Sequence, residues 1–286
     1  MAVCAAQHID PGLEDRPVLH LDGPTLTSNM EVLARHAEHD GGVERYVDGL
    51  KFKAGLFDEA LGKGRAKHLN EETFKGLVAF MPSVRRRIGP RLKETGFAAF
   101  RDALTALLDG AGDTATADAR MAAFRANFPD DGKHRWVRDL AAEVLHYTLP
   151  ELYPMMCRWV WDVKTNTGVL REIWHDDNVE RLVIDIPDNY AAFLMLREEL
   201  SQFLTDNGVY RDVMHYVDLL QAQIYSHYVS SQGSTYLRAD FSQEEDPMQY
   251  IRRLLGLDGI DTTTGRTRFK TVDGEAHLVA DIKLLN

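Results

Sequence analysis

The sequence predicts a mainly α-helical fold, a multi-helix bundle with orthogonal or antiparallel packing and a small C-terminal β-hairpin. Over most of the chain, apolar side chains recur every three or four residues, which is the period of an amphipathic helix. Glycine, proline and capping residues fall at the ends of these segments. Near the C-terminus, Asp273-Gly274 joins two β-prone runs, which is the strongest short-range signal for a hairpin.

In the first half of the chain, helical periodicity is interrupted only by short breaks. Leu26, Met30 and Leu33 begin the first such segment, which should end at Gly41-Gly42. Another segment has acidic residues in its first turn and stops before Pro82. We therefore expect helices at 24–40, 43–61, 70–81, 94–108, 115–128 and 134–148.

The second half of the chain predicts a buried helix, a short strand and two long helices. Residues 155–163 are too apolar and aromatic to face water on all sides, which favours a core helix. Residues 180–186 are enriched in β-branched side chains and are followed by a proline, which is typical of a short strand. Gly208 can close the first of the two long helices. We expect those helices at 189–205 and 209–229, a shorter one at 247–255, and hairpin strands at 266–272 and 275–282.

No composition shift or internal repeat divides the chain into several clear domains. The 286 residues are 44% hydrophobic and 27% charged, close to the average for globular proteins. The simplest partition has an N-terminal arm at 1–23, a helical body at 24–256, and a loop with the hairpin at 257–286.

Charge and cysteine content narrow the class of protein. Asp and Glu outnumber Lys and Arg by 44 to 33, giving a net charge of −11, which disfavours nucleic-acid binding. Cys4 and Cys157 are too few and too far apart for a disulfide framework. No apolar run is long enough for a membrane span, and the N-terminus lacks a targeting pattern. These observations predict a cytoplasmic protein without a membrane partner.

A basic strip at residues 85–93 is the strongest local charge contrast. It contains five cationic residues and no acidic one, in an otherwise acidic chain. Arginine offers planar, bidentate donors, so the strip could hold an anionic small molecule or the acidic face of a protein partner. It could equally be a surface strip that pairs with acidic groups of the same chain. Its candidate binding residues are Arg85, Arg86, Arg87, Arg91 and Lys93.

An aromatic segment at residues 136–175 contains all four tryptophans of the chain. Aromatic walls with a few polar groups are typical of small-molecule pockets, although large aromatic residues more often fill cores. Histidine beside carboxylates can transfer protons near neutral pH. Candidate pocket residues are Trp136, Tyr147, Tyr153, Arg158, Trp159, Trp161, Arg171 and Trp174. Candidate acid–base residues are His146, Glu143, Asp162 and His175.

The evidence for metal or cofactor chemistry is weaker. His36 and His39 are three residues apart on one helix face, which is a spacing that can serve one metal ion, but no third ligand lies nearby. Histidines also interact favourably with the carbonyl end of a helix without any metal. No nucleotide-binding or catalytic motif occurs, so we expect no cofactor.

Together these observations predict an accessory or regulatory protein that acts by binding another protein. The basic strip and the terminal hairpin are both features suited to docking. The alternative is an enzyme or small-molecule-binding protein with an aromatic-lined pocket around residues 136–175.

Overall fold

The computed structural model describes residues 17–176, 182–236, 247–259, 266–270 and 276–278. Within them the chain is mainly helical, as predicted. No helix in this part is both long enough and apolar enough to cross a membrane. The α-helices are α1 (Gly23–Glu38), α2 (Glu44–Leu61), α3 (Glu71–Ala79), α4 (Pro82–Arg85), α5 (Ile88–Thr95), α6 (Phe97–Leu108), α7 (Ala117–Arg125), α8 (Trp136–Thr148), α9 (Val169–Glu172), α10 (Tyr190–Asp206), α11 (Val213–Tyr236) and α12 (Pro247–Leu254).

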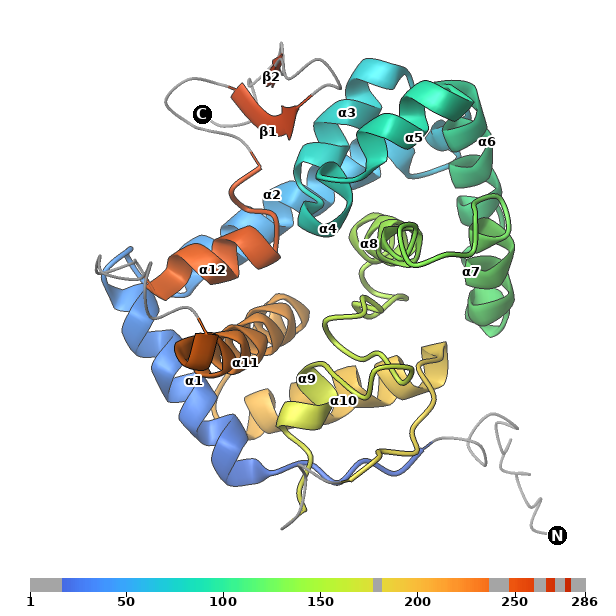
Figure 1. Ribbon diagram of the computed structural model, residues 1–286. Coiled ribbons are helices and arrows are strands. Elements are labelled where there is room, and N and C mark those ends of the chain that lie inside the picture. The colour runs from blue at the N-terminus through green and yellow to red at the C-terminus, as the bar shows by residue number, and fades with distance from the viewer. Residues whose placement is uncertain (1–16, 177–181, 237–246, 260–265, 271–275, 279–286) are drawn as a thin grey trace, which may run out of the picture.

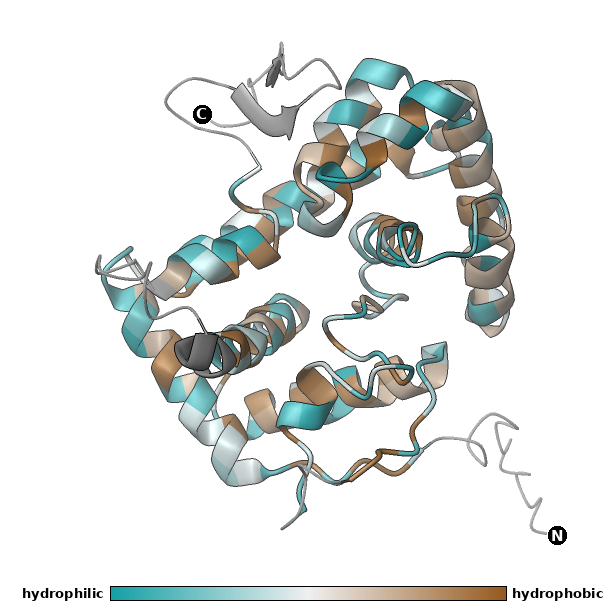
Figure 2. Cartoon of the chain, viewed as in Figure 1, coloured by the Kyte–Doolittle hydropathy of each residue, from teal (hydrophilic) through white to brown (hydrophobic). Residues whose placement is uncertain are grey.

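Helix α8 lies at the centre of the helical body (Figure 1). It packs against α2, α4, α6 and α7, and all its residues except Arg138 are buried. The peripheral helices are amphipathic instead, and Figure 2 shows hydrophobic and hydrophilic residues alternating along α1, α2 and α10. Each of these helices buries one side and exposes the other. The fold is therefore a ring of amphipathic helices around one buried helix.

Several helix ends follow the predicted capping chemistry. The side chain of Asn70 accepts a hydrogen bond from the backbone N–H of Thr73 at the start of α3. The side chain of Asn189 does the same for Ala192 at the start of α10. Each contact pairs an N–H group that has no partner within its own helix.

The predicted helix at 94–108 corresponds to α6, while its first two residues form the end of α5. Gly96 separates α5 from α6 and has a φ of +76°, a left-handed conformation that glycine adopts without strain. Together with α4, α5 makes most of the basic strip helical, although no helix is predicted from the sequence at 82–93. Two short 3₁₀ helices complete this half, at Arg65–His68 and Thr114–Thr116.

The predicted core helix at 155–163 is wrong in its secondary structure. Most of the segment is buried, but it runs as irregular backbone and turns. Its polar backbone groups find partners outside any helix. The N–H of Arg158 donates to the Asp139 carboxylate at 3.1 Å, and the Asp162 N–H donates to the Thr167 carbonyl at 3.0 Å. These contacts, rather than helical hydrogen bonds, satisfy the buried backbone.

The predicted strand at 180–186 is also wrong where the structure describes it, at 182–186. This segment has no regular secondary structure and pairs with no described strand. The side chain of Asn166 takes the place of a strand partner, donating to the Leu182 carbonyl at 2.9 Å and accepting from the Ile184 N–H at 3.1 Å. Side-chain contacts thus pair two of the backbone groups that a neighbouring strand would have bonded.

Near the C-terminus, β1 (Arg266–Lys270) and β2 (Ala276–Leu278) pair in antiparallel fashion. The Asp273-Gly274 turn and the residues after Leu278 lie outside the described residues. The hairpin with its turn therefore stays a prediction.

Candidate functional site

A cleft of about 910 Å³ lies on the outer side of the α8 N-terminus. It is bounded by the end of α7, the loop at 126–135, the first turn of α8, residues 158–164 and Asp188. We call it the arginine cleft, because four of its lining residues are arginines. Its lining residues are Ala122, Arg125, Ala126, Phe128, Pro129, Asp130, Asp131, Gly132, His134, Arg135, Val137, Arg138, Arg158, Asp162, Val163, Lys164 and Asp188.

Arg158 is the most firmly held of these arginines. Its Nε and Nη2 atoms donate to the Asp139 carboxylate, with the shortest distance 2.7 Å from Nη2 to Oδ2. Asp139 is buried in α8 and also accepts the backbone N–H of Arg158. Although burial alone would lower it, the pKa of Arg158 is raised because Asp139 stabilises the charged guanidinium. The Nη1 group takes part in none of these contacts.

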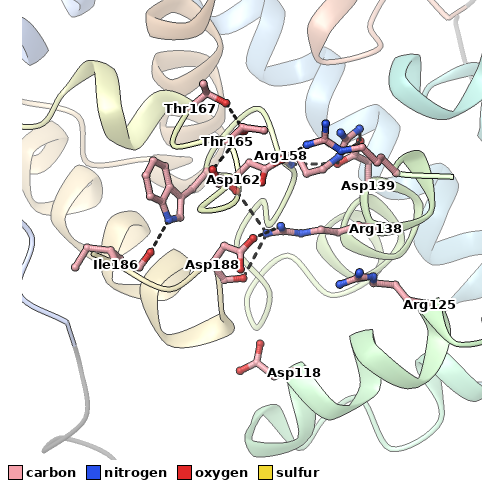
Figure 3. Close-up of polar contacts among 12 residues, drawn as sticks. Asp118, Arg125, Arg138, Asp139, Arg158, Asp162, Thr165, Thr167, Ile186 and Asp188 are labelled. Atoms are coloured by element: carbon pink, nitrogen blue, oxygen red, sulfur yellow. Dashed lines mark hydrogen bonds and ion pairs between the residues drawn. The ribbon is translucent and has the colours of Figure 1, made fainter. Parts of the chain in front are cut away.

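Two further arginines come from the start of α8 and are oriented by carboxylates of the cleft wall. Figure 3 shows one of them, Arg138, beside Asp188. Arg135 donates from Nη2 to Asp162 at 2.6 Å. Arg138 forms an ion pair with Asp188 and donates to the Asp188 and Trp161 carbonyls at 3.3 and 3.4 Å. The cleft therefore contains three arginines whose side chains are fixed before any ligand binds.

Arg125 and Lys164 are the more exposed cations of the cleft. Arg125 lies at the end of α7, where its Nη2 atom is 3.9 Å from Asp130. Lys164 lies on a turn that the backbone pairing of Asp162 with Thr167 holds in place. The lining thus has five cationic side chains and four carboxylates, while a fifth carboxylate, Asp139, pairs with Arg158 from α8. The positive end of the α8 dipole adds to this local field.

His134 lies at the same cleft and is oriented by Asp131. Its Nδ1 atom is 2.8 Å from the Asp131 Oδ1 atom, which also accepts the backbone N–H groups of Lys133 and His134. The bond from His134 holds the pKa of Asp131 below its ordinary value. Asp131 therefore stays a carboxylate and acts as an acceptor, so Nδ1 is the donor.

The predicted aromatic residues are mainly core residues. Trp136, Tyr147, Tyr153 and Trp161 are buried, while Trp159 and Trp174 are half-buried and pack against the core. None of these six lines the arginine cleft. Of the residues singled out in the aromatic segment, Arg158 and Asp162 do line it. The predicted pocket with aromatic walls is therefore a different arrangement from this cleft, and it shares only Arg158 and Asp162 with it.

The other predicted acid–base residues lie elsewhere. His146 is buried, with Nε2 3.0 Å from Asp218 and Nδ1 2.9 Å from the Tyr153 carbonyl. Glu143 is buried against Lys53. His175 is exposed, with Nδ1 3.8 Å from Asp22. Arg171 donates to the Leu182 carbonyl at 2.9 Å.

The basic strip separates into structural and exposed members. Arg85 is buried and forms two hydrogen bonds with the Asp258 carboxylate, at 2.9 and 3.0 Å. Arg91 is half-buried and pairs with Glu94 at 3.0 Å. Arg86, Arg87 and Lys93 are exposed, and none makes an ion pair with a described residue.

The candidate metal ligands His36 and His39 both lie at the end of α1, with His39 as its C-cap. Burial lowers the pKa of His36, whose Nδ1 atom is buried without a hydrogen-bond partner among the described residues. Within the described ranges, no group of three His, Cys, Asp or Glu residues is placed to hold a metal ion.

Sequence reasoning missed most of the cleft. Arg135 and Arg138 are three residues apart and so share a helix face, which was a usable signal. Arg125, Lys164 and Asp188 come from distant segments that only the fold brings together. Comparisons with protein-family models, curated proteins and solved structures find no match for this chain. Function is therefore inferred from the cleft itself.

Proposed function

We propose that this protein binds a small anionic molecule in the arginine cleft. The observation that carries the proposal is the set of three arginines, each oriented by its own carboxylate, around a cavity of about 910 Å³. A cavity of this size is in the range that holds a small organic ligand, roughly 300–1,000 Å³.

The orienting carboxylates make binding easier, not harder. A free arginine loses side-chain freedom when it binds an anion, and this loss costs roughly 0.5–1.5 kcal/mol per side chain. Arg158 is already held by Asp139, and Arg135 by Asp162, before any ligand arrives. Each guanidinium has five N–H donors, so both retain donors that can point at a ligand. Arg125 and Lys164 supply further charge at the rim.

This proposal corresponds to the small-molecule-binding alternative predicted from the sequence, with a different lining. We also propose that the protein is cytoplasmic, because its sequence contains only two cysteines and a reducing compartment fits that number. Apart from the carboxylates, His134 is the residue of the cleft lining suited to proton transfer near neutral pH.

Calorimetric titration with pyrophosphate and with citrate tests the proposal. We expect at least one of them to bind, with an affinity that falls as salt rises, because exposed charges are screened over about 8–10 Å. The variant Arg125→Gln/Lys164→Gln should bind the anion about tenfold more weakly. Its melting temperature should be unchanged, because both substituted side chains are exposed. Arg35→Gln, at an exposed arginine of α1 outside the cleft, is the control and should bind normally. If neither anion binds, or if the double variant binds like the wild type, the proposal fails.

A second candidate function is the accessory or regulatory role, in which the protein binds an acidic protein partner. The observation that favours it is the exposure of Arg86, Arg87 and Lys93 on an acidic chain. The predicted C-terminal hairpin would be a further docking element. Charge reversal at Arg86 and Arg87 should then abolish a salt-sensitive, stoichiometric complex isolated from the native source. A complex that survives both reversals would rule out this role for the strip.

A further inference from the structure

The arginine cleft supplies more donors than one carboxylate can accept. Arg158 keeps its whole Nη1 group, and Arg135 keeps its Nε and Nη1 groups, because only the remaining nitrogens bond to Asp139 and Asp162. Arg125 has no carboxylate within hydrogen-bond distance in the described chain, since its contact with Asp130 is 3.9 Å long. A carboxylate has two oxygens and is matched by a single guanidinium fork.

The donors also come from different directions. Arg125 ends α7, Arg135 and Arg138 begin α8, Arg158 lies in the irregular buried segment, and Lys164 lies on the turn that follows. Figure 3 shows Arg125, Arg138 and Arg158 reaching the region from separate parts of the chain. A planar anion uses donors in one plane, whereas the three terminal oxygens of a phosphate monoester can be met from several sides. Such a group also has a charge of roughly −1.5 to −2 at pH 7.

The rest of the lining indicates the chemistry of the organic group to which the phosphate is attached. One part of the wall is apolar and consists of Ala122, Ala126, Phe128, Pro129 and Val163. Another part consists of the exposed carboxylates Asp130 and Asp131, whose oxygens can accept hydrogen bonds from hydroxyl groups. An inorganic phosphate ion would leave most of the 910 Å³ cavity unfilled. An organic group with hydroxyls would fill it.

We propose that the ligand of the arginine cleft is a phosphate monoester of a small hydroxylated molecule, of the sugar-phosphate type. This inference rests on the proposed anion binding and makes it more specific. The arginines and Lys164 hold the phosphate, the apolar wall contacts the carbon skeleton, and Asp130 and Asp131 accept the hydroxyl hydrogens.

Titrations with three probes test the ligand class, namely glucose 6-phosphate, glucuronate and inorganic phosphate. The first two share a sugar ring and differ in the anionic group at its sixth carbon. We expect glucose 6-phosphate to bind at least tenfold more tightly than either of the others. If glucuronate binds as tightly, the ligand is a carboxylate and the inference falls, while anion binding stands. If inorganic phosphate binds as tightly, the organic part contributes nothing and the inference also falls. If none of the probes binds and pyrophosphate and citrate also fail, anion binding itself is refuted.

Variants distinguish a forked contact from simple charge attraction. Arg158→Lys keeps the charge but loses the planar fork, so the preference for glucose 6-phosphate over glucuronate should fall about tenfold. Lys164→Gln should weaken both anions together, and Arg35→Gln should weaken neither. If Arg158→Lys does not fold, because Asp139 is buried beside it, Arg125→Gln is the substitute and should reduce the same preference. An unchanged preference in the folded variant would contradict the proposed phosphate contact.

Discussion

Lys53 and Glu143, ninety positions apart in the chain, form a buried ion pair at the centre of the helical body. Lys53 Nζ donates to Glu143 Oε2 at 3.0 Å and to the Leu255 carbonyl at 2.9 Å. It also lies 3.8 Å from the centre of the Tyr147 ring, which is a cation–π distance. The ammonium therefore joins α2, α8 and the end of α12, three elements that are far apart in sequence.

Removing one partner of this pair should be far more damaging than removing both. Lys53→Met leaves the Glu143 carboxylate buried and unpaired, which costs roughly 3–5 kcal/mol. Lys53→Met/Glu143→Leu leaves no buried charge and should recover most of that loss. Chemical denaturation of the two single variants and the double variant measures the effect. A double variant as unstable as the sum of the single variants would show that the two residues do not interact.

The pH dependence of the pair has a definite sign. Burial raises the pKa of Glu143 above its ordinary value of 4.5 and lowers the pKa of Lys53 below its ordinary value of 10.5. Because folded Glu143 binds its proton more tightly than unfolded Glu143, it contributes stability below pH 4.5. This contribution is lost as pH rises through the pKa of Glu143 in the folded protein. The lowered Lys53 pKa stabilises it above pH 10.5, and that contribution is lost as pH falls through the folded value. The free energy of unfolding of the double variant, relative to wild type, should therefore be highest between these limits. A difference that does not change with pH would contradict these shifts.

Arg85 and Arg87 are two positions apart in the basic strip, but their substitution should change the stability of the protein by very different amounts. Arg85→Ala leaves Asp258 without its two hydrogen bonds and the Ala79 carbonyl without its contact at 2.9 Å. This loss should cost roughly 3–5 kcal/mol, as for other buried ion pairs. Arg87→Ala, at an exposed position, should change stability by less than about 0.5 kcal/mol. Equal effects in thermal melts would show that Arg85 is not a structural residue.

Helix positions were predictable because they depend on local pattern. The asparagine caps at Asn70 and Asn189 and the break at Gly96 can all be read from a few neighbouring residues, although Gly96 was overlooked. The strand predicted at 180–186 is not formed at 182–186, where the side chain of Asn166, well before it in sequence, bonds to the backbone of Leu182 and Ile184. Periodicity does not register a side chain that replaces a backbone partner.

The cleft was harder to predict than the helices for a related reason. Arg158 is oriented by Asp139, and Arg138 by Asp188, across separations that no short motif spans. The sequence predicted a pocket lined by tryptophans because all four tryptophans lie in one segment of the chain. Burial of Trp136 and Trp161 instead builds the core that positions the arginines on its outer side. Local sequence indicates which residues are buried, but not which charged groups the fold brings together.

Substitution of Trp161 should destabilise the protein more than substitution of Trp159, because only Trp161 is fully buried. Trp161 is buried, and its Nε1 donates to the Ile186 carbonyl at 2.9 Å. Trp161→Ala should therefore cost about 3–5 kcal/mol, the range for a large buried aromatic residue. Trp159 is only half-buried, so Trp159→Ala should cost clearly less. Urea denaturation of both variants makes the comparison, and a larger loss for Trp159 would contradict the described packing.

Cys157 should be chemically inert until the protein unfolds. Its side chain is fully buried, with Sγ 3.6 Å from Met155 Sδ, and burial raises the thiol pKa well above its ordinary value. Both the lack of access and the scarcity of thiolate slow attack on a disulfide reagent. In a Cys4→Ser background, which removes the other thiol, a chromogenic disulfide such as Ellman's reagent should not react with the native protein at pH 8. After denaturation in guanidinium chloride, one thiol per chain should react. Rapid reaction of the native variant would show that the buried segment around Cys157 opens readily, in which case Arg158 beside it would not be rigidly held for ligand binding.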